Sequence, residues 1–307
     1  MSPDPMTPTE STAVHAAAAP RLVSGMSELA GDYDGFILDL WGVIHDGVRA
    51  YPAAVDCLAR LKRAGKHTVL LSNAPRRAAA IESAMAGMGI DRAIYDHVYS
   101  SGEEVHEHLL SRSDPWYAAL GRACYHIGPE RDRSVREGLG LDVVESVEEA
   151  EFVLNTGPGD DDETVADYED VLEAAARRSL PMICANPDTE VIRGGRRIVC
   201  AGALALRYEE LGGEVRSHGK PHAPSYRRCF ELLRVGDRRR VLAVGDSLRT
   251  DIAGADAAGI DSALVTGGLH AEELGLAPGS PPDPDRLARA CAAAGHVPVA
   301  AMAAFAW

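Results

Sequence analysis

The sequence predicts an α/β protein built on a parallel β-sheet, because short apolar runs alternate with segments of helical periodicity along most of the chain. The apolar run 36–38 (FIL) is typical of a buried strand. In the segment after it, Ala54, Leu58 and Leu61 recur at the spacing of one helix face. The next apolar run, 68–71 (TVLL), is typical of a second buried strand. A strand, a helix and a strand in this order form a parallel sheet with a crossover helix.

The same alternation continues to the end of the chain, whose 307 residues suffice for two domains or one domain with a large insertion. Further strands are expected at 124–127, 152–155, 181–184, 241–244 and 262–265. Helices are expected around 165–172, from about 250 to 259, and ending near 295. Residues 1–20 are rich in Pro, Ser, Thr and Ala without periodicity, which predicts a disordered tail. The apolar residues 297–307 are expected to pack on the core or on a second subunit of a homodimer.

The composition excludes several classes of function. The formal net charge is −15, which repels nucleic-acid phosphates and anionic lipid, so neither nucleic acid nor a membrane is expected as a partner. Six scattered cysteines without a C-x-x-C pair predict reduced thiols in the core. No secretory signal is recognisable, and the longest apolar stretch reaches about half a membrane span. These features predict a cytoplasmic protein.

Residues with useful chemistry follow the predicted strands, at the edge where open α/β sheets bind their ligands. Asp39 is either a turn residue, the commoner role of a single Asp, or a nucleophile and metal ligand. Ser72 and Asn73 could donate hydrogen bonds to phosphate oxygens or only shape a turn. Lys220, before Pro221, is by itself more typical of a solvated charge. None of these residues decides the function alone.

The stretch 245–251 (GDSLRTD) is the most specific of these signals. Asp246 ends a strand and Asp251 enters the following helix, so both carboxylates are expected near one point. Two carboxylates so placed suit Mg²⁺, which binds few protein oxygens and keeps waters for the substrate. Alternatively, Asp251 only caps the helix. The spacing by itself does not separate the two.

Taken together, the order of aspartate, hydroxyl residue, lysine and acidic pair resembles the haloacid dehalogenase superfamily of aspartate-nucleophile phosphohydrolases. About 150 residues of α/β pattern separate Ser72 from Lys220, as in class II members, whose cap domain is inserted there. Asn186-Pro187-Asp188, followed by Gly202 and a helix expected to run to Lys220, is similar to the class IIA branch. That branch includes phosphatases of pyridoxal phosphate, phosphoglycolate, sugar phosphates and nucleotides. The resemblance covers roughly residues 25 to 270.

This resemblance implies a Rossmann-like parallel sheet core with an inserted α/β cap domain. The core is expected at 21–82 and 213–307, and the cap at 83–212. The implied activity is Mg²⁺-dependent hydrolysis of a small phosphorylated metabolite, such as a sugar, polyol or cofactor phosphate. In the capped relatives the cap closes over the core and contacts the leaving group, and the matching candidates here are Asn186 and Asp188. An Asx-Pro turn explains that pair equally well, and Arg193 nearby either binds a second anion or is solvated.

The resemblance also implies roles for the core residues. Asp39 would attack phosphorus to form an aspartyl-phosphate. Mg²⁺ would be held by the carboxylate of Asp39, the main-chain carbonyl of Trp41 and Asp246, with Asp251 orienting the metal waters or the lysine. The residues that would surround the phosphoryl group are Ser72, Asn73 and Lys220.

Trp41 departs from the family pattern, because relatives usually have a second aspartate there that protonates the leaving oxygen and later activates water. An indole N–H does neither. Losing a general acid/base typically costs 10² to 10⁴ in rate, about 3 to 5 kcal/mol of barrier. His45 or Asp46, just downstream, could replace it, or both could simply shape a polar turn. Catalysis is therefore expected to be reduced or rerouted.

Two alternatives to the phosphatase remain. A catalytically weakened protein of the same fold could bind a phosphorylated metabolite, and Trp41 is the main support for that reading. A metal-independent dehalogenase, whose family members have a tyrosine two residues after the nucleophile, is the other. The acidic pair argues against it, because Asp246 and Asp251 beside Asp39 would repel one another without a cation.

Overall fold

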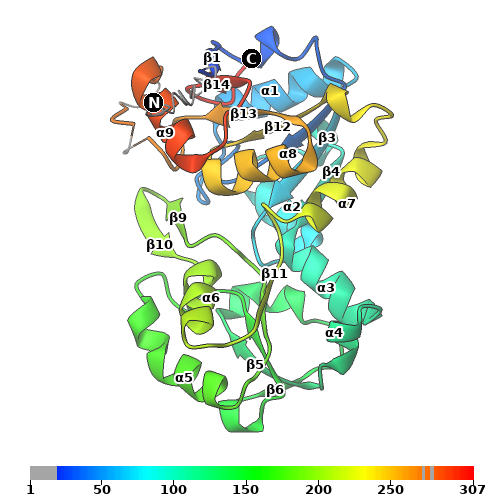
Figure 1. Ribbon diagram of the computed structural model, residues 1–307. Helices are drawn as coiled ribbons and strands as arrows, with labels where there is room; N and C mark the ends of the chain where they lie inside the picture. Colours follow the sequence, from blue (N-terminus) through cyan, green and yellow to red (C-terminus); the bar gives the residue numbers. More distant parts are fainter. Residues whose placement is uncertain (1–18, 272–273, 277–279) are drawn as a thin grey trace, which may run out of the picture.

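A seven-stranded parallel sheet forms the core of one lobe of the computed structural model (Figure 1). In spatial order its strands are β1 (Arg21–Leu22), β14 (Ala300–Met302), β13 (Asp261–Val265), β12 (Val241–Gly245), β2 (Gly35–Leu38), β3 (His67–Ser72) and β4 (His97–Ser100). Every neighbouring pair in this sheet is parallel. The structure describes residues 19–271, 274–276 and 280–307, so the predicted tail lies outside the described residues except for positions 19 and 20.

Helices cover both faces of this sheet, which is why its central strands are continuous apolar runs. One face packs on α1 (Pro52–Arg63) and α2 (Ala78–Gly87). The other face packs on α7 (Ala223–Leu233) and α8 (Ala253–Ala258). Beyond them, α9 (Pro284–Ala294) packs against η7, and the apolar C-terminal residues supply strand β14 to the sheet of their own chain.

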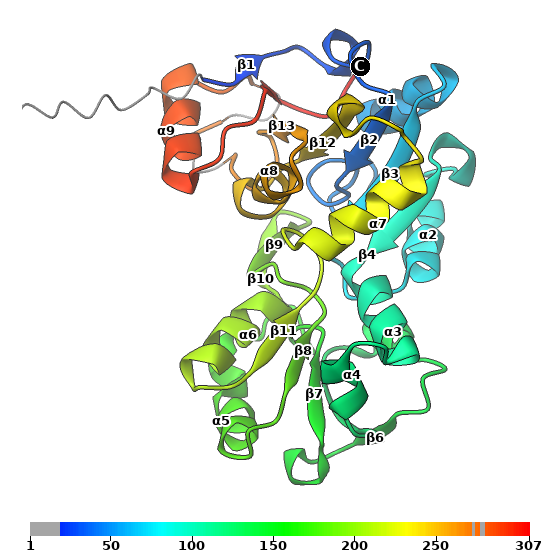
Figure 2. The ribbon, with the colours of Figure 1, turned by 45° about the vertical axis from the view of Figure 1, so that its right-hand side comes forward.

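The second lobe contains a smaller sheet of five parallel strands (Figure 2). In spatial order they are β11 (Val215–Ser217), β8 (Met182–Cys184), β7 (Phe152–Asn155), β5 (Ala123–Ile127) and β6 (Asp142–Val144). One face is covered by α5 (Glu169–Arg177) and α6 (Ala201–Glu210). The other is covered by α3 (Ser101–Ser111) and α4 (Pro115–Ala119).

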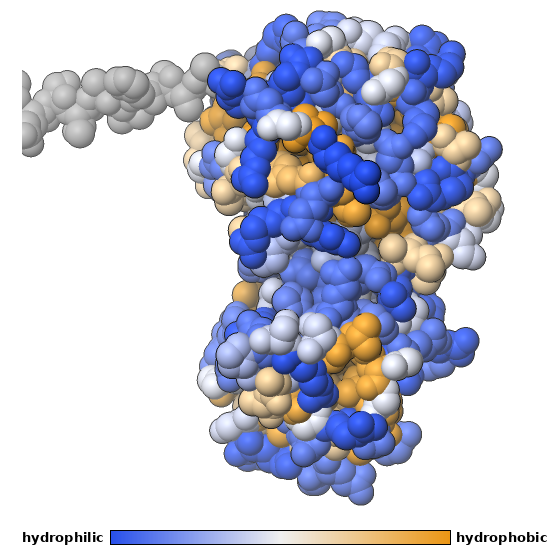
Figure 3. Space-filling model, turned by 90° about the vertical axis from the view of Figure 1, so that its right-hand side faces the viewer, coloured by the Kyte–Doolittle hydropathy of each residue, from blue (hydrophilic) through white to orange (hydrophobic). Residues whose placement is uncertain are grey.

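An antiparallel hairpin of β9 (Glu190–Arg193) and β10 (Arg196–Val199) leaves the smaller lobe and points toward the larger one (Figures 1 and 2). The space-filling view shows two lobes joined by a narrower middle (Figure 3). Short turns of helix complete the described structure: η1 (Met26–Glu28), η2 (Arg92–Ile94), η3 (Glu130–Val135), η4 (Val147–Glu149), η5 (Val165–Tyr168), η6 (Arg238–Arg240) and the π turn η7 (Leu248–Ile252).

The predicted fold class, an α/β parallel-sheet core with an inserted α/β cap, is confirmed. The helix expected to run to Lys220 is shorter, because α6 ends at Glu210 and β11 follows it. Strand β4 belongs to the core sheet and β11 to the cap sheet. We therefore propose that the chain crosses between the lobes near residues 101 and 218, later than the boundaries at 83 and 213 that the sequence suggested.

Two further observations bear on the composition. All six cysteines are buried and unpaired. Within the described parts of the chain, no helix is both long and apolar enough to cross a membrane.

Candidate active site

The loop that follows β2 brings Asp39 and Gly42 against the end of β12. The backbone N–H of Asp39 donates to the carbonyl of Val244 at 2.9 Å, which continues the sheet pairing by one residue. Gly42 then turns the chain with a φ of +74°, and a Cβ built on it would lie 1.9 Å from Oδ2 of Asp246. Glycine is therefore required here both for the left-handed backbone and for the close approach of the loop to that carboxylate.

The end of β12 positions the acidic pair predicted from the sequence. Asp246 accepts a hydrogen bond from the backbone N–H of Leu269 at 2.8 Å. Asp251, in the π turn η7, accepts one from the backbone N–H of Ser247 at 3.2 Å. A Cβ on Gly245 would lie 2.0 Å from Cγ of Asp251, so only glycine lets this side chain fold back toward the strand.

Three carboxylates and one lysine converge at this edge of the sheet. One ligand atom from each of Asp39, Asp246 and Asp251 lies within 4.8 Å of the other two. The ammonium of Lys220 lies 2.6 Å from Oδ1 of Asp39 and 2.7 Å from Oδ1 of Asp251. All four residues are at most 8% exposed. One positive charge among three carboxylates leaves an excess of negative charge, and a divalent cation would balance it.

The electrostatics of the four groups agree with this need for a cation. Burial, and then the charge of Asp251, raise the pKa of Asp39 well above its ordinary value, although Lys220 opposes the shift. Burial and the charge of Asp251 also raise the pKa of Asp246, to about 7. Burial acts to lower the pKa of Lys220, but the carboxylates of Asp251 and Asp39 outweigh it and the net shift is upward. The lysine is therefore a permanent positive charge beside Asp39.

Asn73 connects the core loops and the cap. Its Oδ1 accepts a hydrogen bond from the backbone N–H of Lys220 at 2.7 Å. Its Nδ2 donates to the carbonyl of Lys220 at 3.1 Å and to Oδ1 of Asp188 at 2.9 Å. Both amide hydrogens are thus engaged, so we assign Asn73 to positioning Lys220 in place of direct phosphate binding. Ser72 is buried in the same loop, and its Oγ accepts a hydrogen bond from the backbone N–H of Ala74 at 3.1 Å, which leaves its own hydrogen free.

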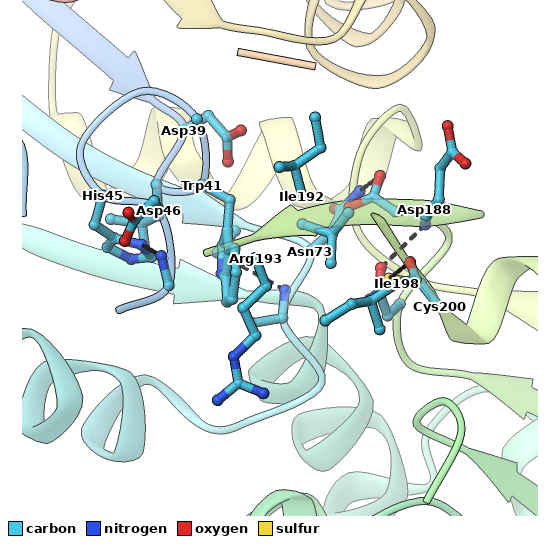
Figure 4. A pocket seen from close by; sticks show the side chains of 18 of the residues that line it. Asp39, Trp41, His45, Asp46, Asn73, Asp188, Ile192, Arg193, Ile198 and Cys200 are labelled. Carbon is cyan, nitrogen blue, oxygen red and sulfur yellow. Dashed lines mark hydrogen bonds between the residues drawn. The ribbon is translucent and has the colours of Figure 1, made fainter. Parts of the chain in front are cut away.

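Trp41, His45 and Asp46 form one compact turn (Figure 4). The rings of Trp41 and His45 pack edge to face with centroids 5.3 Å apart. Nδ1 of His45 accepts from the backbone N–H of Gly47 at 3.0 Å, and burial, followed by the charge of Arg76, lowers the pKa of His45 to about 4. Oδ1 of Asp46 accepts from two backbone N–H groups downstream, at 2.9 and 2.6 Å. These are the contacts of residues that shape a polar turn.

A cavity of about 530 Å³ is lined by these core loops on one side and by the cap hairpin on the other. Asn186 and Asp188 line it, and Oδ1 of Asn186 accepts from the backbone N–H of Asp188 at 3.0 Å, as in an Asx turn. The hairpin contributes Arg193, and the backbone N–H of Gly194 at its tip donates to the carbonyl of Asp46 at 3.3 Å. Ile192 and Ile198 of the hairpin also line the cavity (Figure 4). The hairpin therefore touches the core loop that carries Trp41.

Sequence reasoning missed several charged residues that line this cavity. Among them are Arg76, Arg131, Asp132 and Asp161. Of these, Arg76 could have been found, since it lies four residues after Ser72 in the same loop. The others come from cap turns that no motif marks.

Comparison with known proteins identifies the family. A model described as haloacid dehalogenase-like hydrolase matches residues 36–142, and one described as HAD-hydrolase-like matches residues 217–291. A crystal structure of a haloacid dehalogenase-like hydrolase from Brucella suis is 35% identical, with a TM-score of 0.78, over 92% of this chain and 100% of its own. The chain belongs to the haloacid dehalogenase-like hydrolase family.

Two curated relatives indicate the branch of the family to which the chain belongs. Chronophin from Mus musculus is 29% identical over 81% of this chain and 86% of its own length. D-glycerol 3-phosphate phosphatase from Mycobacterium tuberculosis is 28% identical over 80% of this chain and 66% of its own length. These matches confirm the predicted membership in the class IIA branch of the superfamily and the predicted enzyme class, a hydrolase of this family.

Proposed function

We propose that the protein is a Mg²⁺-dependent phosphomonoester hydrolase that acts on a small phosphorylated metabolite through an aspartyl-phosphate. The observation that carries this proposal is the convergence of Asp39, Asp246 and Asp251 with a buried lysine. The relative from Mycobacterium tuberculosis is named for a phosphorylated polyol, which supports a substrate of that size. A cavity of about 530 Å³ accommodates such a molecule.

The donor set suits Mg²⁺, because hard cations prefer carboxylate and carbonyl oxygens. The carboxylates of Asp39 and Asp246 and the main-chain carbonyl of Trp41 would hold the ion, and Asp251 would orient its waters and Lys220. When bound, Mg²⁺ neutralises charge on the phosphoryl oxygens.

The residues of the chain divide the reaction into two displacements. In the first, a carboxylate oxygen of Asp39 bonds to phosphorus while the ester P–O bond breaks, and the alcohol leaves with a proton from solvent. In the second, water attacks the same phosphorus, and phosphate and the Asp39 carboxylate are released. Lys220 and the hydroxyl of Ser72 bind the phosphoryl oxygens and stabilise the negative charge on them during both displacements.

The missing general acid/base limits the second displacement most. Trp41 neither donates nor accepts the required proton, and His45 is a poor substitute, because its Nδ1 is hydrogen-bonded and its pKa is about 4. Oδ1 of Asp46 accepts hydrogen bonds from the backbone N–H groups of Val48 and Arg49, which hold this carboxylate within its own turn. We therefore propose that water attacks the phosphoaspartate without strong base assistance, which makes the breakdown of that intermediate slow.

A phosphate-release screen over sugar, polyol and cofactor phosphates tests the proposal. Wild type with Mg²⁺ should release phosphate from at least one ester, whereas EDTA-treated protein and Asp39→Asn should lose at least about 100-fold of that rate. Turnover that persists in Asp39→Asn would show that the reaction occurs elsewhere.

The second candidate is a weakly catalytic protein that binds the same class of metabolite, and Trp41 favours it. It predicts tight binding of the phosphoester without release above the uncatalysed rate. A metal-independent dehalogenase fits the site less well, because three carboxylates around one lysine repel one another without a cation.

A further inference from the structure

Arg76 lines the cavity and has a buried hydrogen-bond donor without a partner. Its Nε is buried and has no hydrogen-bond partner. Two other arginines, Arg136 and Arg228, also have a buried Nε without a partner, but each donates to a glutamate through another guanidinium nitrogen. Among the described residues, Arg76 makes no such bond, and its closest acid, Oδ1 of Asp132, lies 3.5 Å from Nε. A guanidinium left with free donors beside a cavity is suited to bind an oxyanion that enters it.

Two further arginines line the same cavity. Arg131 and Arg193 both pair with Asp161, at 3.2 and 2.9 Å. Their positive charges act on Arg76, whose pKa is lowered first by burial and then by these two neighbours, although Asp132 opposes the shift. Three guanidinium groups from the core, a cap turn and the cap hairpin therefore share one region of a chain whose net charge is −15.

The two acids that pair with these arginines, Asp132 and Asp161, do not satisfy all of their donors. Oδ1 of Asp132 lies 3.5 Å from Nε of Arg76 and makes no hydrogen bond with it. The single carboxylate of Asp161 is divided between Arg131 and Arg193. Each guanidinium has five N–H donors, so most donors of the group remain available for a ligand.

The position of Arg76 sets the size of that ligand. It lies four positions after Ser72, so their Cα atoms lie at most about 14 Å apart. Figure 4 shows the carboxylate of Asp39 above Trp41 and the guanidinium of Arg193 below it. One cavity of about 530 Å³ is lined both by Asp39 and by the three arginines, so one small molecule can place a phosphoryl group at Asp39 and a second group near the arginines.

We propose that Arg76, with Arg131 and Arg193 beside it, binds a second anionic group of the substrate. The substrate is then a small phosphomonoester that also carries a carboxylate or a second phosphate a few atoms from the ester. This inference rests on the proposed phosphomonoesterase site. Arg76 is the main specificity residue. Arg131 and Arg193 each donate a hydrogen bond to Asp161, whereas Arg76 donates none to an acidic side chain of the described residues.

Kinetics with matched substrates test the inference. One pair is 3-phosphoglycerate and glycerol 3-phosphate, in which a hydroxymethyl group replaces the carboxylate. A second pair is fructose 1,6-bisphosphate and fructose 6-phosphate, which tests a phosphate in the same role. Wild type should have a higher kcat/KM for the anionic member of one pair, and Arg76→Met should lower that ratio at least about tenfold, the loss expected for a charged hydrogen bond. Arg76→Lys, which keeps the charge, should lose less.

Arg196→Gln is the matched control. Arg196 lies on the hairpin that carries Arg193, but it pairs with Asp162 outside the cavity. It should keep the wild-type ratio, and thermal unfolding of each variant shows whether the fold is kept. Equal ratios in wild type and Arg76→Met for both pairs would overturn the inference.

A binding measurement separates this inference from the proposed reaction. With Mg²⁺ present, calorimetric titration compares 3-phosphonopropionate with propylphosphonate, which differ by one carboxylate and cannot be hydrolysed. If wild type prefers 3-phosphonopropionate and Arg76→Met loses that preference, the result supports the subsite even if no phosphate is ever released. Equal affinities, together with equal kinetic ratios, would leave a phosphatase without this subsite.

Discussion

Lys220 keeps its positive charge in a buried position because carboxylate oxygens of Asp39 and Asp251 lie within 2.7 Å of its ammonium. The same contacts fix the ammonium beside the oxygen that would attack phosphorus. Asn73 holds the backbone of Lys220 from both sides, through its N–H and its carbonyl. At the scale of single residues, the site therefore depends on side chains that orient one another before any substrate enters.

Asp132 gives the stability of the fold a pH dependence that is separate from that of the three site carboxylates, Asp39, Asp246 and Asp251. Burial raises its pKa from 3.8 to about 6 in the folded protein. A carboxyl group whose pKa is raised on folding stabilises the fold fully below its unfolded pKa, and this contribution is lost as the pH rises through the folded value. The contribution of Asp132 to the free energy of unfolding should therefore fall between pH 4 and pH 6, by no more than about 3 kcal/mol. Urea unfolding across that range measures it.

Asp132→Asn is the corresponding control, because an amide does not titrate. The difference in unfolding free energy between wild type and this variant should change across pH 4 to 6 in the direction given above. A difference that stays constant with pH would contradict the assignment.

The loop after β2 shows how one element sets the geometry of the site. Gly42→Ala places a Cβ 1.9 Å from Oδ2 of Asp246, in addition to the strain of a φ of +74°. Since the clash must move either the loop or the carboxylate, Mg²⁺ affinity and phosphate release should fall at least about tenfold. Calorimetric titration with Mg²⁺ and the phosphate-release assay measure the two effects.

Gly65→Ala is a matched control, since Gly65 has a φ of +71° and no atom within 4 Å of a built Cβ. It should cost about 1 kcal/mol of stability and leave Mg²⁺ affinity unchanged. Equal losses of metal affinity in the two variants would mean that backbone strain alone, and not the contact with Asp246, explains the effect.

The strands differ in how well the sequence predicts them. The core strands β2, β3 and β12 are continuous apolar runs buried on both faces, so periodicity and length identify them. The hairpin β9–β10 was missed, because each of its strands has only four residues, and two apolar residues lie beside charged ones without alternation. Its signal was present nonetheless: Gly194 and Gly195, with φ of +54° and +82°, form a two-residue turn between two short segments that each contain apolar residues. Strands of two or three residues, such as β1 and β11, are too short for any pattern.

At the scale of the molecule, the two lobes together create the cavity. The predicted core residues Asp39, Asp246 and Asp251 meet because they follow the neighbouring strands β2 and β12 of the core sheet. Lys220 reaches them from the segment between the cap strand β11 and helix α7. The cap side could not be predicted in the same way. Arg76 and Asp132 face each other only because η3 folds back over the loop after β3, and the intervening 55 positions of sequence carry no pattern for that contact.

The most direct test of the account is whether Asp39 becomes phosphorylated. Because Trp41 offers no general base, the phosphoaspartate should break down slowly and accumulate during turnover with Mg²⁺. Acid quenching followed by proteolysis and mass spectrometry should then find one added phosphoryl group on the peptide that carries Asp39, and none in Asp39→Asn or after EDTA treatment. Phosphate release that proceeds while this peptide stays unmodified, or a phosphoryl group found on another residue, would contradict the account.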